Sequence, residues 1–564
     1  MKNVRRRNSY TCVLRSCLPL LLLVTLGVTE LSSAQSAPPD LRFGAVEAFR
    51  APAEAAGLGL GWERIIFFWS QLQPYGPGDW NVFHVEDGWL AEAVAHGRQV
   101  VGLIEGTPKW ATDGSPGAGV PRGLYLPIDD PGNLWAEFVR TLVRRYAGPL
   151  RVDHWIIWNE PDIAPGDYGA QWEGSVADFV QLAKVAYLAA KQENPDVVIH
   201  FAGLTYWHDV VNNRPLYLQR YIDEARKDPG AAANNFYFDA VSLHIYFTTD
   251  TVYDITAEFA ALLRRNGLSQ PIWINETNAA PYDDSLNPWT IPDWTVTLDQ
   301  QAGFVVQAFA QGLAAGAQRI AVYKLMDYPG YPPGYEPYGM IRSDGSRRPA
   351  FKALRAAITH FAGTRSATMD RAESRAIVTL DRGDKVTRVL WARGGEDVPV
   401  SLPALAPQAL LVTHLGQAKK IAPVDGAYRL TLPAALCNDP KHGCAVGGAP
   451  LMLVEERSAT ELPAAVPAAS ASEAAGVTAT PEPSSTPTVT PTATRTPTST
   501  PTRTPSAMPT ETATATMTPV PTPTPAVLDM LAEGASSVAG LLVLGLAVGV
   551  ALSAWLVNRR RKRI

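Results

Sequence analysis

Two segments of this sequence each end an apolar run with a glutamate that follows an asparagine. One is the segment 154–161, HWIIWNEP, which contains Glu160, and the other is 271–278, PIWINETN, which contains Glu276. Two carboxyl groups in one pocket can cleave a glycosidic bond, because one protonates the leaving oxygen while the other attacks the anomeric carbon. At a separation of about 5 to 5.5 Å this attack forms a covalent intermediate, and the configuration is retained.

The two glutamates take different roles if they share one site. An anionic Glu276 nearby, together with partial burial, would raise the pKa of Glu160 and keep it protonated. Glu160 is therefore predicted to be the acid/base and Glu276 the nucleophile. Taken alone, either glutamate could instead be a solvated loop residue that follows a strand.

A parallel α/β barrel would bring these glutamates together. Short β-rich runs alternate with amphipathic helical patterns over residues 38–363, which predicts a (β/α)8 TIM barrel. Glu160 and Glu276 then close the fourth and seventh strands, at the end of the barrel where active sites form. The expected strands are 41–46, 64–68, 100–104, 154–158, 197–201, 240–244, 272–275 and 320–324, and helices are expected at 134–146, 177–192, 257–265 and 350–361.

Residues 366–456 have no helical period and are expected to form a small all-β sandwich domain after the barrel. Its two cysteines, Cys437 and Cys444, are an even pair close in sequence, and in an exported chain they are predicted to form a disulfide. Together with His442 they offer too few ligands for a metal ion, so no metal site is expected.

The two ends of the chain predict export and membrane anchoring. Residues 1–36 combine basic residues, a short apolar run and small residues, as a secretory signal peptide does. Residues 537–557 are apolar for long enough to be a transmembrane helix, and the basic tail 558–564 is typical of the cytoplasmic side. The Thr/Pro-rich segment 459–526 cannot bury enough surface to fold and is expected to be a disordered linker. We therefore expect a single-pass protein of the cell membrane with an extracellular barrel.

The exported part of the chain is acidic. The whole sequence has 49 Lys and Arg against 54 Asp and Glu, but its two end segments hold ten of the basic residues and one of the acidic ones, which leaves a net charge of about −14. Such a charge argues against nucleic acid as a partner.

Aromatic side chains follow several of the expected strands and could stack on the apolar faces of sugars, which favours an oligosaccharide, polysaccharide or glycoside as the substrate. Trp110 and Trp207 are predicted to bind substrate, although each such ring could also be a packing residue. Glu105, which closes the third strand, could bind substrate or cap a helix. The aromatic residues are Trp110, Tyr206, Trp207, Tyr246, Trp289, Trp294, Tyr328 and Tyr331.

The motif WNEP at 158–161, with NE at 275–276, resembles the (β/α)8 clan of retaining glycoside hydrolases. Family 39, the β-xylosidases and α-L-iduronidases, is the most similar, since a β-rich domain follows the barrel there too, and family 5 is next. The resemblance implies that Asn159 binds the sugar 2-hydroxyl, that Glu160 is the acid/base and that Glu276 is the nucleophile. No cofactor is implied, because carboxylate catalysis requires none.

The same resemblance implies roles for three further residues. Arg64, near the second strand, would orient the nucleophile, and His244 and Tyr246, after the sixth, would contact the substrate and the nucleophile. From the residues alone, Arg64 could pair with Glu63 or Asp79 instead, and His244 could be a core histidine.

Two other functions fit the same sequence. A catalytically inactive barrel could serve as a surface carbohydrate-binding protein, although binding alone does not require two mutually repelling acids. A transglycosylase would use the same residues and differ only in passing the intermediate to a sugar instead of water.

Overall fold

The computed structural model describes residues 38–167, 169–291, 293–439 and 441–457. The expected signal peptide at 1–36, linker at 459–526, transmembrane helix at 537–557 and tail at 558–564 lie outside these residues and stay predictions. Within the described part of the chain, no helix is both long enough and apolar enough to cross a membrane.

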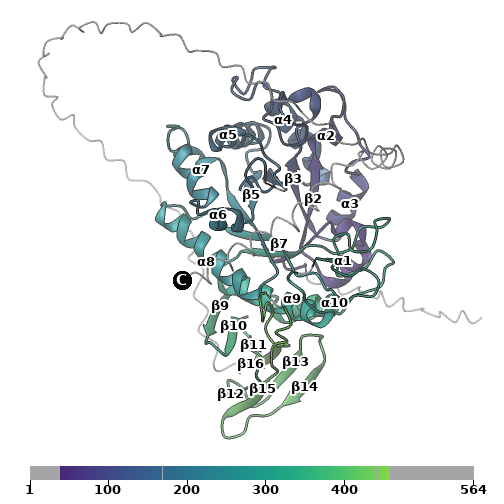
Figure 1. The fold of residues 1–564 in the computed structure, drawn as a ribbon, viewed down its shortest axis with the longest axis vertical. Coiled ribbons are helices and arrows are strands. Elements are labelled where there is room, and N and C mark those ends of the chain that lie inside the picture. Colours follow the sequence, from purple (N-terminus) through teal and green to yellow (C-terminus); the bar gives the residue numbers. More distant parts are fainter. Residues whose placement is uncertain (1–37, 168, 292, 440, 458–564) are drawn as a thin grey trace, which may run out of the picture. The chain divides into compact units, whose positions relative to one another are not determined.

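Eight parallel strands close into a barrel in which each strand pairs with the next and β8 pairs with β1 (Figure 1). The expected TIM barrel is therefore confirmed. Every strand is almost wholly buried, as expected where helices cover a parallel sheet. The strands are β1 Phe43–Val46, β2 Trp62–Phe68, β3 Gln99–Glu105, β4 His154–Ile157, β5 Val198–Leu204, β6 Ala240–Tyr246, β7 Ile272–Asn278 and β8 Arg319–Val322.

Helices connect the strands and surround the barrel (Figure 1). The α-helices are α1 Pro52–Leu58, α2 Trp69–Leu72, α3 Asp87–Ala95, α4 Leu134–Tyr146, α5 Val176–Glu193, α6 Trp207–Val211, α7 Tyr217–Ala225, α8 Thr249–Arg265, α9 Leu298–Ala314 and α10 Pro349–Phe361. Four 3-10 helices join them: η1 Ala48–Arg50, η2 Lys109–Ala111, η3 Gly148–Leu150 and η4 Ala232–Tyr237.

Local sequence explains where the longer helices begin. The side chain of Asn133 caps α4 by accepting a hydrogen bond from the Ala136 amide. Ser175 and Asp178 form a reciprocal capping box at the start of α5, and Thr297 and Gln300 do the same for α9.

The interior of the barrel is a packed core and not a channel. A cluster of buried side chains fills it, in which the rings of Trp62 and Trp273 lie 5.2 Å apart. Because apolar groups occupy this space, polar side chains that serve a site must gather where the strands end. The buried members of the cluster are Trp62, Val101, Leu103, Ile156, Trp273 and Ala321.

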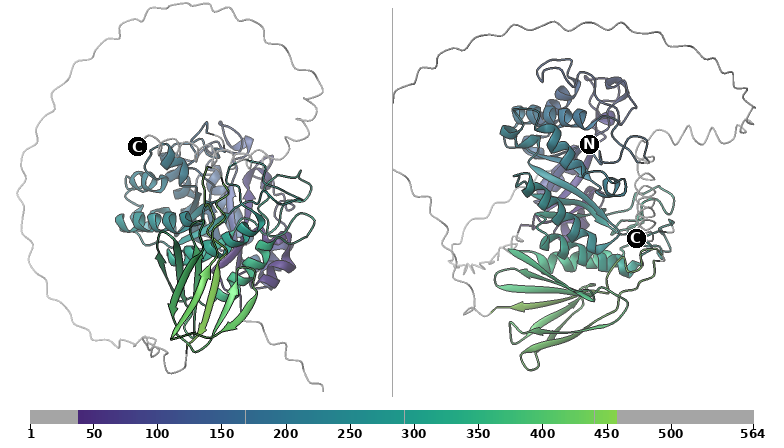
Figure 2. Two further views of the ribbon diagram at one scale, coloured as in Figure 1. Left: turned by 60° about the horizontal axis from the view of Figure 1, so that its bottom comes forward. Right: turned by 60° about the vertical axis from the view of Figure 1, so that its left-hand side comes forward.

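After α10 the chain forms antiparallel strands (Figure 2). A six-stranded sheet has the order β14-β13-β16-β11-β10-β9, and β12 pairs with β15 in a second, two-stranded sheet. Side chains of the two sheets share a small core that includes Leu390, Leu402 and Leu432, which agrees with the expected sandwich. The strands are β9 Ser366–Arg371, β10 Arg375–Asp381, β11 Lys385–Ala392, β12 Val398–Pro403, β13 Ala409–Thr413, β14 Ala418–Ile421, β15 Ala427–Leu432 and β16 Leu451–Glu456.

The six-stranded sheet also packs on the barrel. Val378, Trp391 and Met452 belong to the same core cluster as residues of α9 and α10. The Gln307 side chain of α9 is fully buried; its Nε2 donates to the Gly448 carbonyl at 2.9 Å, and its Oε1 accepts from the Gly447 amide at 3.1 Å. The loop that carries these glycines also contains a disulfide between Cys437 and Cys444.

Candidate active site

Glu276 lies within β7, close to the end of the strand, and its carboxylate is held on both oxygens. The Arg64 guanidinium of β2 donates to Oε1, and the Tyr246 hydroxyl of β6 donates to Oε2. All three side chains are largely or fully buried. Burial alone would raise the pKa of Glu276, but the positive charge of Arg64, the neighbouring His244 and the hydrogen bond from Tyr246 outweigh it and lower the pKa. Glu276 is thus held as an anion.

Glu160 follows β4 and is positioned by an unusual backbone. Both Trp158 and Glu160 have positive φ angles, 72° and 47°, and the Glu160 amide donates to the Gly203 carbonyl of β5 at 3.0 Å. The side chain is completely buried, and its Oε1 lies 2.7 Å from Nδ1 of His244. Burial raises the pKa of Glu160 to about 7, although the hydrogen bond from His244 opposes that effect. Glu160 is thus largely protonated below neutral pH.

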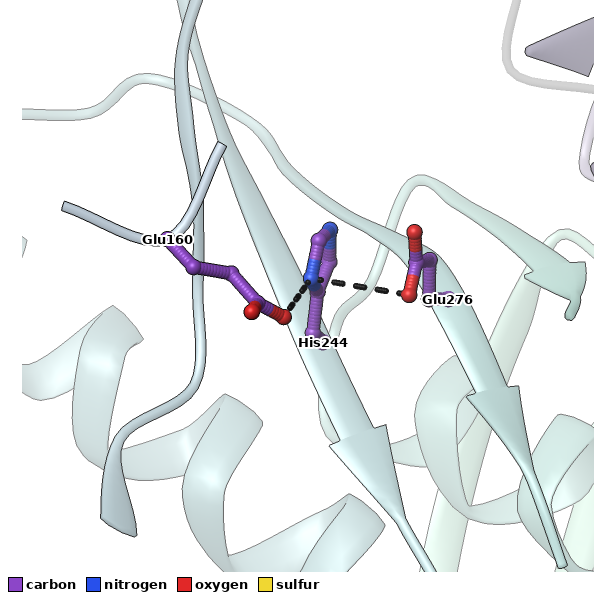
Figure 3. A group of neighbouring side chains, drawn as sticks. All are labelled: Glu160, His244 and Glu276. Atoms are coloured by element: carbon purple, nitrogen blue, oxygen red, sulfur yellow. Dashed lines mark hydrogen bonds and ion pairs between the residues drawn. The ribbon is translucent and has the colours of Figure 1, made fainter. Parts of the chain in front are cut away.

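His244 lies between the two carboxylates (Figure 3). Its Nδ1 is 2.7 Å from Glu160 Oε1 and 3.6 Å from Glu276 Oε2. The ligand atoms of these three residues all lie within 4.8 Å of one another, so the two glutamates approach each other closely from β4 and β7. Gly203 makes room for the ring, because a Cβ at this position would lie 2.1 Å from His244 Nε2.

A pocket of about 390 Å³ opens at this end of the barrel. Glu276, Arg64 and Asn159 line it, whereas Glu160 and His244 are buried and are not among its lining residues. Aromatic rings form much of the wall, in two stacked pairs: Phe49 on Trp89 at 4.1 Å and Tyr331 on Tyr335 at 4.3 Å. Flat apolar faces with polar groups at the base suit a sugar ring.

The other predicted site residues have mixed placements. Asn159 lines the pocket; its Nδ2 donates to Gln171 Oε1 at 3.1 Å, and its Oδ1 is buried without a partner among the described residues. Arg64 pairs with Glu276 and not with Glu63, which binds Arg98 at 2.7 Å.

Two of the predicted substrate-binding residues lie outside the lining of this pocket. Trp110 is not among the lining residues; its indole donates to the Gln73 carbonyl at 2.7 Å, and its ring packs against Trp69. Trp207 begins α6, packs against Tyr206 and does not line the pocket either. Of the eight aromatic residues considered from the sequence, Tyr328 and Tyr331 are in the pocket wall.

Several lining residues could not be singled out from the sequence. Glu47 follows β1 with a positive φ of 53° and pairs with Arg50 at 2.6 Å. Phe49 and Trp89 come from η1 and α3. The signal that could have identified Glu47 is its place directly after the first strand, the same position that marked the two glutamates.

The grouping of Glu160, His244 and Glu276 also has the donor types of a metal site. The donors fit a metal poorly, because the Arg64 guanidinium binds Glu276 and its fixed positive charge would repel a divalent cation. The arrangement suits chemistry that the two carboxyl groups perform themselves.

Comparison with known proteins identifies the fold. The structure is similar to that of a family 39 glycoside hydrolase from the gut symbiont Bacteroides cellulosilyticus WH2, with a TM-score of 0.54, 14% sequence identity and coverage of 74% of this chain and 81% of that one. It is also similar to a GH30 endoxylanase from Clostridium papyrosolvens C71, with a TM-score of 0.50, 12% identity and coverage of 75% and 98%. The chain shares their fold. Scans against protein-family models and curated proteins find no match.

Proposed function

We propose that this protein is a retaining glycoside hydrolase that cleaves O-glycosidic bonds by double displacement. The observation that carries the proposal is the pair of buried carboxyl groups, Glu160 just after β4 and Glu276 on β7, with oxygens within 4.8 Å of each other. That separation suits direct attack by a carboxylate, since inverting enzymes need a gap of about 6.5–9.5 Å to admit a water molecule. The shared fold with glycoside hydrolases adds support by analogy.

In the first step, Glu276 attacks the anomeric carbon while Glu160 gives its proton to the departing glycosidic oxygen. The bond from carbon to the leaving oxygen breaks, and an ester between the sugar and Glu276 forms. Arg64 and Tyr246 keep Glu276 anionic and fix the direction of its oxygens. The leaving group departs as an alcohol.

In the second step, the Glu160 carboxylate removes a proton from water, and the water oxygen displaces Glu276 from the anomeric carbon. The sugar leaves with its original configuration, and both glutamates return to their starting states. Because His244 engages Oε1 of Glu160, Oε2, which has no partner among the described residues, would be the oxygen that exchanges the proton. Asn159, whose Oδ1 has no partner in the part of the chain that the structure describes, would accept a hydrogen bond from the sugar 2-hydroxyl.

The test is turnover of a panel of para-nitrophenyl glycosides by the full chain, with Glu160→Gln and Glu276→Gln alongside. We expect Glu276→Gln to lose activity by about a thousandfold or more, because an amide in place of this carboxylate cannot form the ester. Glu160→Gln should lose about a hundredfold or more on substrates with poor leaving groups and less on aryl glycosides, whose leaving group needs little protonation. Incubation with EDTA should leave the wild-type rate unchanged.

Product stereochemistry, followed by NMR, tests the mechanism separately. We expect the first-formed sugar to have the same anomeric configuration as the substrate. In the presence of sodium azide, Glu160→Ala should form a glycosyl azide of retained configuration. Full activity in Glu276→Gln, or an inverted first product, would refute the assignment. Sugar binding without any turnover would indicate the carbohydrate-binding alternative, and transfer to added sugar in preference to water would indicate a transglycosylase.

A further inference from the structure

A third carboxyl group, Glu105, reaches the pocket at the end of β3. It lines the pocket together with Arg64, Asn159 and Glu276, and only 4% of its surface is exposed. Its backbone stands in register with Phe68 at the end of β2. The side chain therefore shares the pocket wall with Glu276 and is nearly removed from solvent.

Among the described residues, Glu105 accepts no hydrogen bond and forms no ion pair. The two other pocket carboxylates differ: Glu47 pairs with Arg50 at 2.6 Å, and Glu276 binds Arg64 and Tyr246. The carboxyl oxygens of Glu105 can therefore be satisfied only by what occupies the pocket, and a polar group with so little exposed surface needs such a partner. The unmet hydrogen-bonding capacity of Glu105 faces the space where a ligand would sit.

We infer that Glu105 is a substrate-binding residue that hydrogen-bonds a hydroxyl group of the sugar bound over Glu276, and that this pocket selects uncharged sugars over uronic acids. The inference rests on the proposed glycosidase function and adds a substrate class to it.

The charges around the pocket explain the exclusion of uronic acids. Among the described lining residues the cations are Arg50 and Arg64, and each already pairs with a glutamate. His84 also lines the pocket, but burial lowers its pKa to about 4, so that its ring is neutral at neutral pH. A sugar carboxylate would thus find no unpaired cation among these residues, and the anionic carboxylate of Glu276 would oppose its binding.

The state of Glu105 suits a neutral hydroxyl group. Burial raises its pKa to about 8, and the nearby carboxylates of Glu160 and Glu276 add to that effect while Arg64 opposes it. At neutral pH the group is mostly a carboxylic acid, which can donate one hydrogen bond to a hydroxyl and accept another. Glutamine has the same shape and also both donates and accepts.

The experiment compares the full chain with its Glu105→Ala and Glu105→Gln variants on para-nitrophenyl β-D-xyloside, β-D-glucoside, β-D-galactoside, α-L-arabinofuranoside, β-D-glucuronide, β-D-galacturonide and α-L-iduronide. We expect wild-type turnover of at least one neutral sugar and none of the three uronides. On that neutral sugar, Glu105→Ala should lower kcat/KM by about tenfold, mainly through KM, and Glu105→Gln should keep most of it. Glu396→Ala, an exposed glutamate of the β domain, is the control and should match the wild type.

Thermal unfolding separates binding from a structural role. If Glu105 serves to bind substrate, Glu105→Ala and Glu105→Gln should unfold at a temperature at least as high as the wild type, because no protein partner loses a hydrogen bond. The inference is overturned by wild-type turnover of a uronide at a rate comparable to its neutral counterpart, by unchanged kinetics of Glu105→Ala, or by lost activity that merely follows lost stability. No turnover of any glycoside would instead refute the proposed function itself.

Discussion

The two catalytic candidates are identical in type and differ only in what surrounds them. Glu276 receives hydrogen bonds from Arg64 and Tyr246, whereas Glu160 is fully buried and has His244 as its partner. One environment stabilises a carboxylate, and the other favours the protonated acid. The sequence could predict the glutamates because each follows an apolar strand. Only the family resemblance points to Arg64 and Tyr246 as partners of Glu276, because from the residues alone Arg64 could pair with Glu63 or Asp79 instead.

These opposite pKa shifts predict a bell-shaped dependence of kcat/KM on pH. Activity should fall as pH drops through the lowered pKa of Glu276, because the nucleophile becomes protonated, and should fall again as pH rises through about 7, because Glu160 loses its proton. Tyr246→Phe removes a hydrogen bond that stabilises the anion of Glu276 and should move the acid limb upward by about one pH unit.

The pH profile of aryl glycoside hydrolysis measures both limbs. Tyr75→Phe, at a tyrosine that is 88% exposed, serves as the control and should leave both limbs in place. An acid limb that stays unchanged in Tyr246→Phe would contradict the assignment of that limb to Glu276.

At the scale of elements, periodicity predicts the barrel strands well and their ends less well. The expected strand 272–275 extends to Asn278, so Glu276 lies inside β7, and β4 ends at Ile157, three residues before Glu160. The pairing of β6 with β7 shifts register between Leu243 and His244. Such an irregularity cannot be predicted from the order of apolar and polar residues in the sequence. It nevertheless sets the direction in which the site residues point.

Helix α9 shows a second limit of periodicity, since it is not among the expected helices. Its glutamines at 300, 301, 307 and 311 are buried, and so is every other residue from Gln300 to Leu313. A helix enclosed on all sides lacks the polar stripe by which an amphipathic helix is found in a sequence.

The contact between β5 and β6 can be tested through Gly203. In Gly203→Ala, the new Cβ would lie 2.1 Å from His244 Nε2, so the ring must move and its hydrogen bond to Glu160 is weakened. We expect kcat/KM to fall by about tenfold or more. Because the bond from His244 lowers the pKa of Glu160, the alkaline limb of the pH profile should move to higher pH.

Gly57→Ala provides the matched control for that substitution. Gly57 lies in α1, and nothing is within 4 Å of a Cβ placed there, so the variant should be active and slightly more stable. If Gly203→Ala reduced activity without moving the alkaline limb, His244 would not act through Glu160.

At the scale of the whole described chain, the barrel and the β domain share one hydrophobic core. Residues of β10, β11 and β16 pack in the same cluster as those of α9 and α10, and polar contacts cross the boundary as well. One is the ion pair of Arg393 with Asp250 at 2.6 Å, and another is the hydrogen bond from Thr387 Oγ1 to the His360 carbonyl at 2.8 Å. The sequence predicts two domains from a change in periodicity, but it contains no comparable signal for how closely they pack.

This shared core predicts that the barrel and the β domain unfold together, in a single calorimetric transition. Gln307→Leu should lower the free energy of unfolding by about 3 kcal/mol, because the half-buried Gly447 amide and the buried Gly448 carbonyl both lose their partner. Gln408→Leu, at an exposed glutamine of the β domain, should change it little. Two separate transitions in the wild type would show that the domains fold independently, and an unchanged stability of Gln307→Leu would show that its two hydrogen bonds do not hold them together.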